Sequence, residues 1–301
     1  MAQISDTSKG IILIISSAFC FALMAVFVRL AGDIFFMQKA FFRNAVAFLV
    51  ALVSILFESF ESKENKNIFS AFGKTTLFFL VLRSVAGTIG IFGNFYAVDH
   101  LILSDAAILN KMAPFFTILF SFILLNEKVK LVPLMAIFFA FLGAMLVVKP
   151  SFDFSKMIPT LSGFLGGLGA GFAYTCVRKL STLGCKGKIV VLFFSGFSML
   201  ASLPYMIFNF NPMTLSQTLC LVMAGICAAG GQFTITAAYF HAPAGKISIY
   251  DYSQIIFSAV FGLLIFGQLP DALSFIGYLV IISMATVNFF FNKRNSTPPQ
   301  A

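Results

Sequence analysis

Long runs of apolar residues, each about the length that crosses a lipid bilayer, follow one another along almost the whole chain. A spanning helix needs about 20 apolar residues, and turn or charged segments separate the runs. The first run is too long for a signal-peptide core, and a second span follows it closely, so we expect it to be retained. The pattern predicts an all-α membrane protein with ten transmembrane helices, at about residues 11–30, 38–57, 75–98, 104–125, 131–149, 160–180, 188–208, 216–239, 246–267 and 272–291.

The second half of the chain repeats the first at a shift of 141 residues. This shift aligns Gly90 with Gly231, Ala97 with Ala238, His100 with His241, Phe116 with Phe257 and Phe120 with Phe261. Each copy holds five predicted helices, an odd number, so the second copy must enter the membrane from the opposite side. We therefore expect two inverted five-helix repeats, residues 1–150 and 151–292, followed by a disordered cytoplasmic tail at 293–301.

Composition agrees with a membrane protein, because 59% of the residues are hydrophobic and only 10% are charged. The net charge of +9 could suggest nucleic acid, but the basic residues are scattered among the membrane loops. Thirteen Lys and Arg residues fall on the side of the N-terminus and four on the opposite side. The positive-inside rule then places both termini in the cytoplasm, and we expect no nucleic-acid partner.

The chain shows no sign of catalytic or metal chemistry in its motifs. Its five cysteines lack C-x-x-C spacing, so we interpret them as small residues of the membrane core without disulfides or metal. The sequence contains no H-E-x-x-H motif, P-loop or nucleophile elbow, and its polar groups are dispersed singly over many helices. We therefore expect neither an enzyme nor a bound cofactor.

Short stretches of both halves resemble a known family. They are FFRN at 41–44, PFF at 114–116 and LNE at 125–127, with AAY at 237–239 and FGQLP at 266–270 in the second half. These are similar to the EamA-domain branch of the drug/metabolite transporter superfamily. The resemblance implies a central cavity, alternating access and movement of a small metabolite across the bacterial inner (cytoplasmic) membrane.

Two departures separate the second copy from the first. Ile255 stands where the first copy has Pro114, and Gln268 stands where it has Glu127. Proline removes a helical hydrogen bond, so the kink of the first copy need not recur in the second. Likewise, any contact that Glu127 makes at the end of its helix need not recur at Gln268.

Four charged residues lie well inside predicted spans, away from their ends: Arg43, Arg83, Lys111 and Asp251. A charge at the centre of a membrane helix costs roughly 3 kcal/mol or more, so such side chains usually face a cavity or a partner. At a rise of about 1.5 Å per residue, Lys111 and Asp251 differ in depth by roughly 10 Å. These depths favour Arg83 over Lys111 as the partner of Asp251, although the sequence leaves both open, and a pair with Arg83 would leave Arg43 and Lys111 as excess positive charge.

This charge pattern predicts a small substrate with an anionic group, such as a zwitterionic amino acid. Arg43 and Lys111 would meet its carboxylate, while Asp251, with Gln254 or the neighbouring tyrosines, would meet its amine. The predicted substrate-binding residues are Arg43, Arg83, Asn94, Asn110, Lys111, Tyr174, Gln232, Tyr250, Asp251, Tyr252 and Gln254.

Other functions remain open from the sequence. They are a proton-coupled exporter of cationic drugs, uptake of a vitamin or nucleobase, and a membrane subunit that transports nothing. The first helix carries no acidic residue between Ile11 and Leu30, which disfavours cation exchange through a carboxylate there. The expected partners are the substrate and the lipid bilayer, and we expect a monomer or a weak homodimer.

Overall fold

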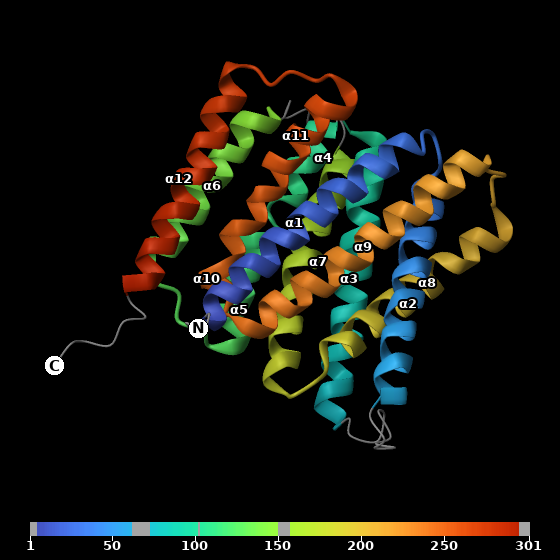
Figure 1. Cartoon of the computed structure of the whole chain (residues 1–301), viewed down its shortest axis with the longest axis horizontal. Coiled ribbons are helices and arrows are strands. Elements are labelled where there is room, and N and C mark those ends of the chain that lie inside the picture. Colours follow the sequence, from blue (N-terminus) through green and yellow to red (C-terminus); the bar gives the residue numbers. More distant parts are fainter. Residues whose placement is uncertain (1–4, 62–72, 102, 150–156, 295–301) are drawn as a thin grey trace.

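The protein is an all-helical bundle, seen here in a computed structural model that describes residues 5–61, 73–101, 103–149 and 157–294 (Figure 1). Side chains are described for these residues apart from 59–61 and 103–105. Within that part of the chain, ten helical spans are long and apolar enough to cross a membrane, which confirms the predicted number.

The first half comprises α1 (Asp6–Leu30), α2 (Phe36–Glu61), α3 (Lys74–His100), α4 (Leu103–Asn110), α5 (Ala113–Leu125) and α6 (Leu131–Val148). The second half comprises α7 (Met157–Thr182), α8 (Gly187–Phe208), α9 (Leu215–His241), α10 (Ala244–Ile247), the 3-10 helix η2 (Ser248–Tyr252), α11 (Ser253–Phe266) and α12 (Ala272–Arg294). The predicted boundary at residue 150 and most of the predicted tail lie outside the described residues, while Lys293 and Arg294 belong to α12.

The fourth span of each half is interrupted. In the first half, α4 ends at Asn110 and α5 begins at Ala113, with Pro114 in its first turn. Proline lacks an amide hydrogen and cannot donate to the carbonyl of Asn110. The second half has no proline there, yet its span changes to a 3-10 turn at 248–252 before α11 begins. The interruption therefore recurs in both copies.

The two halves run in opposite directions through the bundle. The most extensive helix contacts pair α3 with α7, α1 with α9, α6 with α12 and α2 with α8. In the repeat, α1, α2, α3 and α6 correspond to α7, α8, α9 and α12. Replacing each helix by its counterpart turns the pair α3–α7 into α9–α1 and leaves the pairs α6–α12 and α2–α8 unchanged. In Figure 1, α6 and α12 lie side by side and run in opposite senses. This arrangement confirms the inverted repeat.

Glycines allow α3 and α7 to pack with their backbones in close contact. A Cβ on Gly93 would collide with the carbonyl oxygen of Ser162 and lie 3.1 Å from the amide nitrogen of Gly166. A Cβ on Gly166 would lie 2.8 Å from the amide nitrogen of Asn94. Small residues at such spacing are typical of membrane helix interfaces. This close contact fixes the position of α3, the helix that carries Arg83 and Asn94.

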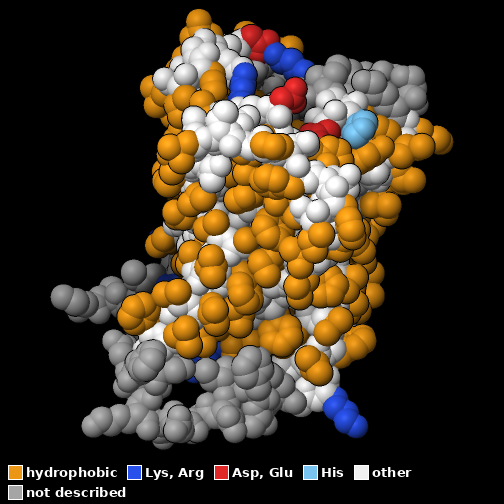
Figure 2. Space-filling model, turned by 90° about the vertical axis from the view of Figure 1, so that its right-hand side faces the viewer, with side chains coloured by type: hydrophobic (Ala, Val, Ile, Leu, Met, Phe, Trp, Pro, Cys, Tyr) orange, Lys and Arg blue, Asp and Glu red, His pale blue; other side chains and the backbone are white. Residues whose placement is uncertain are grey.

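The outer surface of the bundle is apolar between two polar ends. Figure 2 shows hydrophobic side chains over the middle of one face and charged side chains at its ends. Large residues such as Leu264, which is 74% exposed, and Phe57, 68% exposed, point outward. Such extensive apolar exposure is typical of a surface that faces lipid.

The loop end of α6 is attached to the start of α12 by an ion pair between Lys149 and Asp271. The carboxylate of Asp271 also accepts hydrogen bonds from the amide nitrogen and the hydroxyl of Ser274, at 3.0 and 2.8 Å. Together the Lys149 and Ser274 contacts lower the pKa of Asp271 to about 2. A group whose pKa is depressed on folding stabilises the fold above its ordinary pKa and loses that effect as it protonates.

We expect Asp271→Asn to lower the melting temperature, and we expect this decrease to become smaller as the pH falls. The difference from wild type is constant from pH 7 to about 4 and closes as the pH approaches about 2, because only the wild-type carboxylate protonates in that window. Thermal unfolding of the purified protein in detergent between pH 2 and 7 measures this. A difference that widens on acidification would contradict the assignment.

The backbone contact between α3 and α7 generates a second prediction. Gly93→Ala destabilises the protein by about 1–3 kcal/mol, because the added methyl group must force two helix backbones apart. Gly245→Ala is the matched control, since its Cβ would meet only Val129 at 3.8 Å. Both variants are compared by thermal unfolding and by size-exclusion profile in detergent. Equal melting temperatures would show that the two helices can separate without cost.

Candidate functional site

A cavity of about 130 Å³ lies between the two halves, beside both interrupted spans. A single water needs about 10–15 Å³ on a comparable measure, so the cavity accommodates a small solute. Most of the predicted site residues line it: Arg43, Arg83, Asn94, Asn110, Tyr174, Gln232, Asp251 and Gln254. The inverted repeat therefore brings side chains from distant parts of the chain to one place.

Lys111 and Asp251 form an ion pair at the edge of this cavity. The ammonium of Lys111 lies 3.0 Å from Oδ2 of Asp251 and donates a hydrogen bond of 2.6 Å to Oε1 of Gln254. Both charged residues are buried. The Lys111 ammonium is thus already neutralised by the protein.

The expectation that Arg83 pairs with Asp251 is wrong, because Lys111 occupies that role. Straight helices would separate Lys111 and Asp251 by roughly 10 Å in depth. However, Asp251 lies in the 3-10 turn, which rises about 2.0 Å per residue and not 1.5 Å, and the long lysine side chain reaches across the remaining gap. Lys111 is therefore not excess positive charge, and that part of the expectation is also corrected.

Arg83 lies at the floor of the cavity and is held by neutral groups. Its Nη2 donates a hydrogen bond of 3.0 Å to Oε1 of Gln232, and its guanidinium lies 3.6 Å from the centre of the Phe194 ring. A Cβ on Gly87 would lie 2.6 Å from that ring, so glycine leaves room for the stack. Arg83 is 1% exposed, and its Nε has no hydrogen-bond partner among the described residues.

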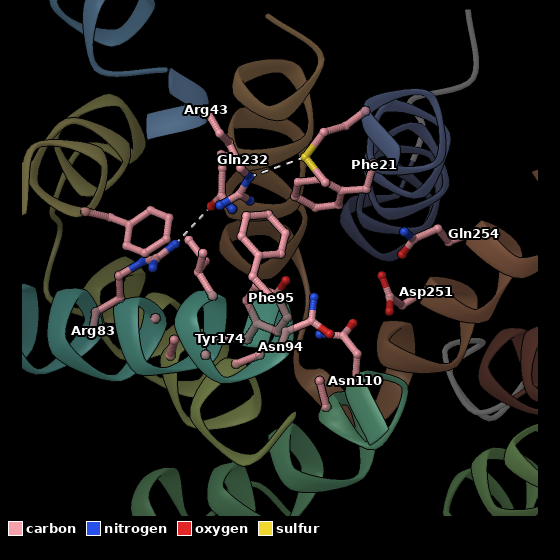
Figure 3. A pocket seen from close by; sticks show the side chains of 18 residues that line it. Phe21, Arg43, Arg83, Asn94, Phe95, Asn110, Tyr174, Gln232, Asp251 and Gln254 are labelled. Carbon is pink, nitrogen blue, oxygen red and sulfur yellow. Dashed lines mark hydrogen bonds between the residues drawn. The ribbon is translucent and has the colours of Figure 1, made fainter. Parts of the chain in front are cut away.

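Arg43 reaches the same cavity from α2 and is held more weakly. Its Nε lies 3.3 Å from the sulfur of Met24, a weak acceptor. The described part of the chain offers its Nη1 no hydrogen-bond partner, although the residue is only 7% exposed. Figure 3 shows both guanidiniums beside Gln232, with Asp251 and Gln254 on the opposite side. The cavity therefore has a strongly positive side.

Aromatic residues separate the cavity from the end of the bundle where α7 and α9 finish. The rings of Tyr174 and Tyr239 stack with their centres 5.4 Å apart, and the hydroxyl of Tyr239 lies 3.2 Å from that of Ser248. Beyond this stack, Arg178 pairs with Glu127 at 2.9 Å. It also donates to the carbonyl oxygen of Tyr239 at 3.2 Å. These contacts join α7, α9 and the end of α5 on this side of the cavity.

An equivalent contact occurs at the opposite end of the bundle. There Nη1 of Arg29 donates a hydrogen bond of 3.2 Å to Oε1 of Gln268, the residue aligned with Glu127. The contact between helix ends thus recurs despite the substitution. It joins a cation to a neutral amide, whereas the first copy has an ion pair.

Tyr250 and Tyr252 were predicted to flank the site but lie behind it. The hydroxyl of Tyr250 donates to the carbonyl oxygen of Ala285 at 3.2 Å, and that of Tyr252 donates to the carbonyl oxygen of Lys111 at 3.1 Å. Neither lines the cavity. They are the sequence neighbours of Asp251, and in a 3-10 turn successive side chains point about 120° apart, so both point away from the cavity that Asp251 faces.

Several apolar lining residues were missing from the sequence-based set. They are Phe21, Met24, Phe95 and Phe194, together with Ile91 and the alanines and glycines of the wall. Phenylalanine occurs 41 times in the chain, so no single ring could be distinguished by pattern. Only the contact of Phe194 with Arg83 identifies its part in the site.

Comparisons with known proteins give one family. The model of the EamA-like transporter family matches residues 8–149. The pseudopaline exporter CntI of Pseudomonas aeruginosa is 30% identical over 276 residues, covering 91% of this chain and 93% of that protein. A Helicobacter pylori protein named only as an uncharacterized transporter is 28% identical over 280 residues, covering 91% and 92%. A solved structure with 14% identity covers 96% of this chain and 99% of its own at a TM-score of 0.82, which shows the fold.

The buried ion pair generates a prediction about stability. Lys111→Met and Asp251→Asn each destabilise the protein by about 3–5 kcal/mol, because each leaves the other charge buried and unpaired. The double variant is destabilised by much less than the sum of the two single-variant destabilisations, because it leaves no buried charge unpaired. Thermal unfolding of the four proteins measures this coupling.

The same cycle on Lys188 and Glu58 is the control. That pair is 3.1 Å apart with both side chains 40% exposed, so its coupling stays below about 1 kcal/mol. Equal coupling in the two cycles would mean that the Lys111–Asp251 contact is no stronger than a surface pair.

Proposed function

The chain belongs to the EamA-like transporter family, and we propose that it is a secondary transporter of a small organic anion or zwitterion such as an amino acid. In this proposal the substrate occupies the cavity between the two halves. The coarser function, membrane transport, follows from the family. The substrate class is our own inference, and it depends on the charge of the cavity.

The observation that carries the proposal is the excess of positive charge in the cavity wall. Among the lining residues, Arg43, Arg83 and Asp251 are charged, and Asp251 is neutralised by Lys111. Buried guanidiniums without carboxylate partners are costly, and a bound carboxylate offsets that cost with charge-assisted hydrogen bonds. Arg43 and Arg83 therefore meet the anionic group, and Arg83 takes the role first given to Lys111.

A substrate amine fits the other side of the cavity. Asp251 and Gln254 both face the cavity, and each already accepts a hydrogen bond from Lys111. Carboxylate and amide oxygens can accept from more than one donor. A substrate ammonium can therefore join this cluster without displacing Lys111, which suits a zwitterion.

The two helix-end contacts support transport by alternating access. Arg178 with Glu127 closes one end of the bundle, and Arg29 with Gln268 holds the other. Inverted repeats alternate by exchanging the arrangements of their halves around a fixed site. In our proposal these contacts form and break in turn, with both chain termini in the cytoplasm and the protein in the bacterial inner membrane.

Export of cationic drugs is the competing transport function, and the charge of the cavity disfavours it. Asp251 is the carboxylate among the lining residues, and Lys111 already pairs with it. A cation entering the cavity would meet two unpaired guanidiniums. Repulsion by these like charges would weaken its binding.

Transport by purified protein in liposomes tests the proposal. We expect amino acids and small organic acids to compete for uptake, and quaternary ammonium cations not to compete. Arg83→Gln raises the half-saturating concentration about tenfold or more, because a charged hydrogen bond contributes about 1.5–3 kcal/mol. Lys188→Gln, at a half-buried position that does not line the cavity, serves as the control. Competition by the cations together with full activity of Arg83→Gln would favour the drug exporter instead.

A further inference from the structure

We propose that the substrate carries two acidic groups, one bound by Arg83 and the other by Arg43. This inference rests on the proposed function and narrows it from any small organic anion to a short dianion. It follows from three features of the cavity: the unsatisfied nitrogens, the balance of charge, and the unequal way in which the two arginines are held.

Both arginines present buried nitrogen atoms that lack a partner. Among the described residues, Nη1 of Arg43 and Nε of Arg83 have no hydrogen-bond acceptor. A buried donor without an acceptor carries the full cost of its lost hydration, and for a charged group the cost is larger. A single carboxylate could satisfy both nitrogens only by bridging the two guanidiniums. Two acidic groups satisfy them separately.

The charge balance also calls for two negative charges. The Lys111–Asp251 pair is neutral, so the lining residues leave the charges of Arg43 and Arg83 uncompensated. A monoanion would neutralise one guanidinium and leave the other buried and unpaired. A dianion leaves no net charge in the cavity, which is the least costly state for a carrier that must close around its substrate in a bilayer.

The two arginines are held unequally, which gives them different roles. Arg83 is fixed by Gln232 and by the ring of Phe194, at 3.0 and 3.6 Å. Arg43 has only the weak contact with the sulfur of Met24, at 3.3 Å. Arg83 therefore sets the position of the first acidic group, while Arg43 is free to adjust to the second. Arg43 is the residue that distinguishes a dianion from a monoanion.

The volume limits the length of the dianion. The cavity of about 130 Å³ is several times what a single water needs and is small for a larger metabolite. It suits a short dicarboxylate. An amino group on such a molecule adds one positive charge and would point toward the acceptor oxygens of Asp251 and Gln254, which lie across the cavity from the arginines in Figure 3.

Matched pairs of ligands that differ by one charge test the inference. Succinate is compared with succinamate, and glutamate with glutamine, by thermal shift of the purified full-length protein and by competition for uptake in liposomes. We expect at least one of the two diacids to bind about tenfold or more tightly than its monoamide, because only the diacid presents a carboxylate to each arginine.

Variants of the arginines separate recognition from folding. In Arg43→Gln, the ratio of the affinity for the diacid to the affinity for its monoamide falls toward one, while the affinity for the monoamide changes little. Arg43→Lys restores part of the preference, and Arg83→Gln weakens both ligands. Lys188→Gln, which does not line the cavity, keeps the wild-type preference. A purely structural role of Arg43 would instead lower the affinity for both ligands equally, and this result would overturn the inference.

The outcomes distinguish this inference from the proposed function. If monoacids bind and are transported as well as diacids, the substrate has one acidic group and only the present inference fails. If neither diacids nor monoacids bind or compete for uptake, both fail.

Discussion

The absence of water in a bilayer constrains this structure most strongly, because every interrupted helix must find partners for its free polar groups inside the protein. Residues at the break in one half form hydrogen bonds with residues at the break in the other half. Tyr252 donates its hydroxyl to the carbonyl oxygen of Lys111, and the ammonium of Lys111 binds the side chain of Asp251 and lies 3.4 Å from its carbonyl oxygen. The ion pair thus joins the halves at the point where their helices are weakest, and the cavity opens beside it.

The sequence predicted the helical spans and their inverted arrangement, because both depend on properties that are local or countable. Apolar length sets the number of spans, and an odd number of helices in each repeat sets its orientation. The pairing of charges was not predictable in the same way. Depth along ideal helices favoured Arg83 as the partner of Asp251, but the 3-10 turn and the length of the lysine side chain brought Lys111 there instead. Pairing depends on where helices deviate from ideal geometry.

The cavity residues found from sequence share one property: they are polar within an apolar span. Arg43, Asn94 and Gln232 carry this signal and line the cavity, because a polar group at that depth must face a cavity or a partner. It gave no information on Phe194, which contributes a ring from another helix, and it included Tyr252, whose hydroxyl supports a backbone carbonyl. Polarity therefore finds residues that avoid lipid, and only their contacts separate a cavity wall from a structural role.

The two repeats are more similar in the arrangement of their helices than in the positions of their charged residues. At the shift that relates the halves, Arg83 aligns with Ala224 and Glu127 with Gln268. One helix-end contact is consequently an ion pair with side chains 19% and 18% exposed, while the other joins an arginine to a neutral amide. In a carrier whose two states exchange the roles of its halves, unequal contacts give the two states unequal energies. If the chain works by the alternating access that we propose, the unequal contacts make one of its two states the resting state, and binding of the proposed anionic substrate must offset the difference.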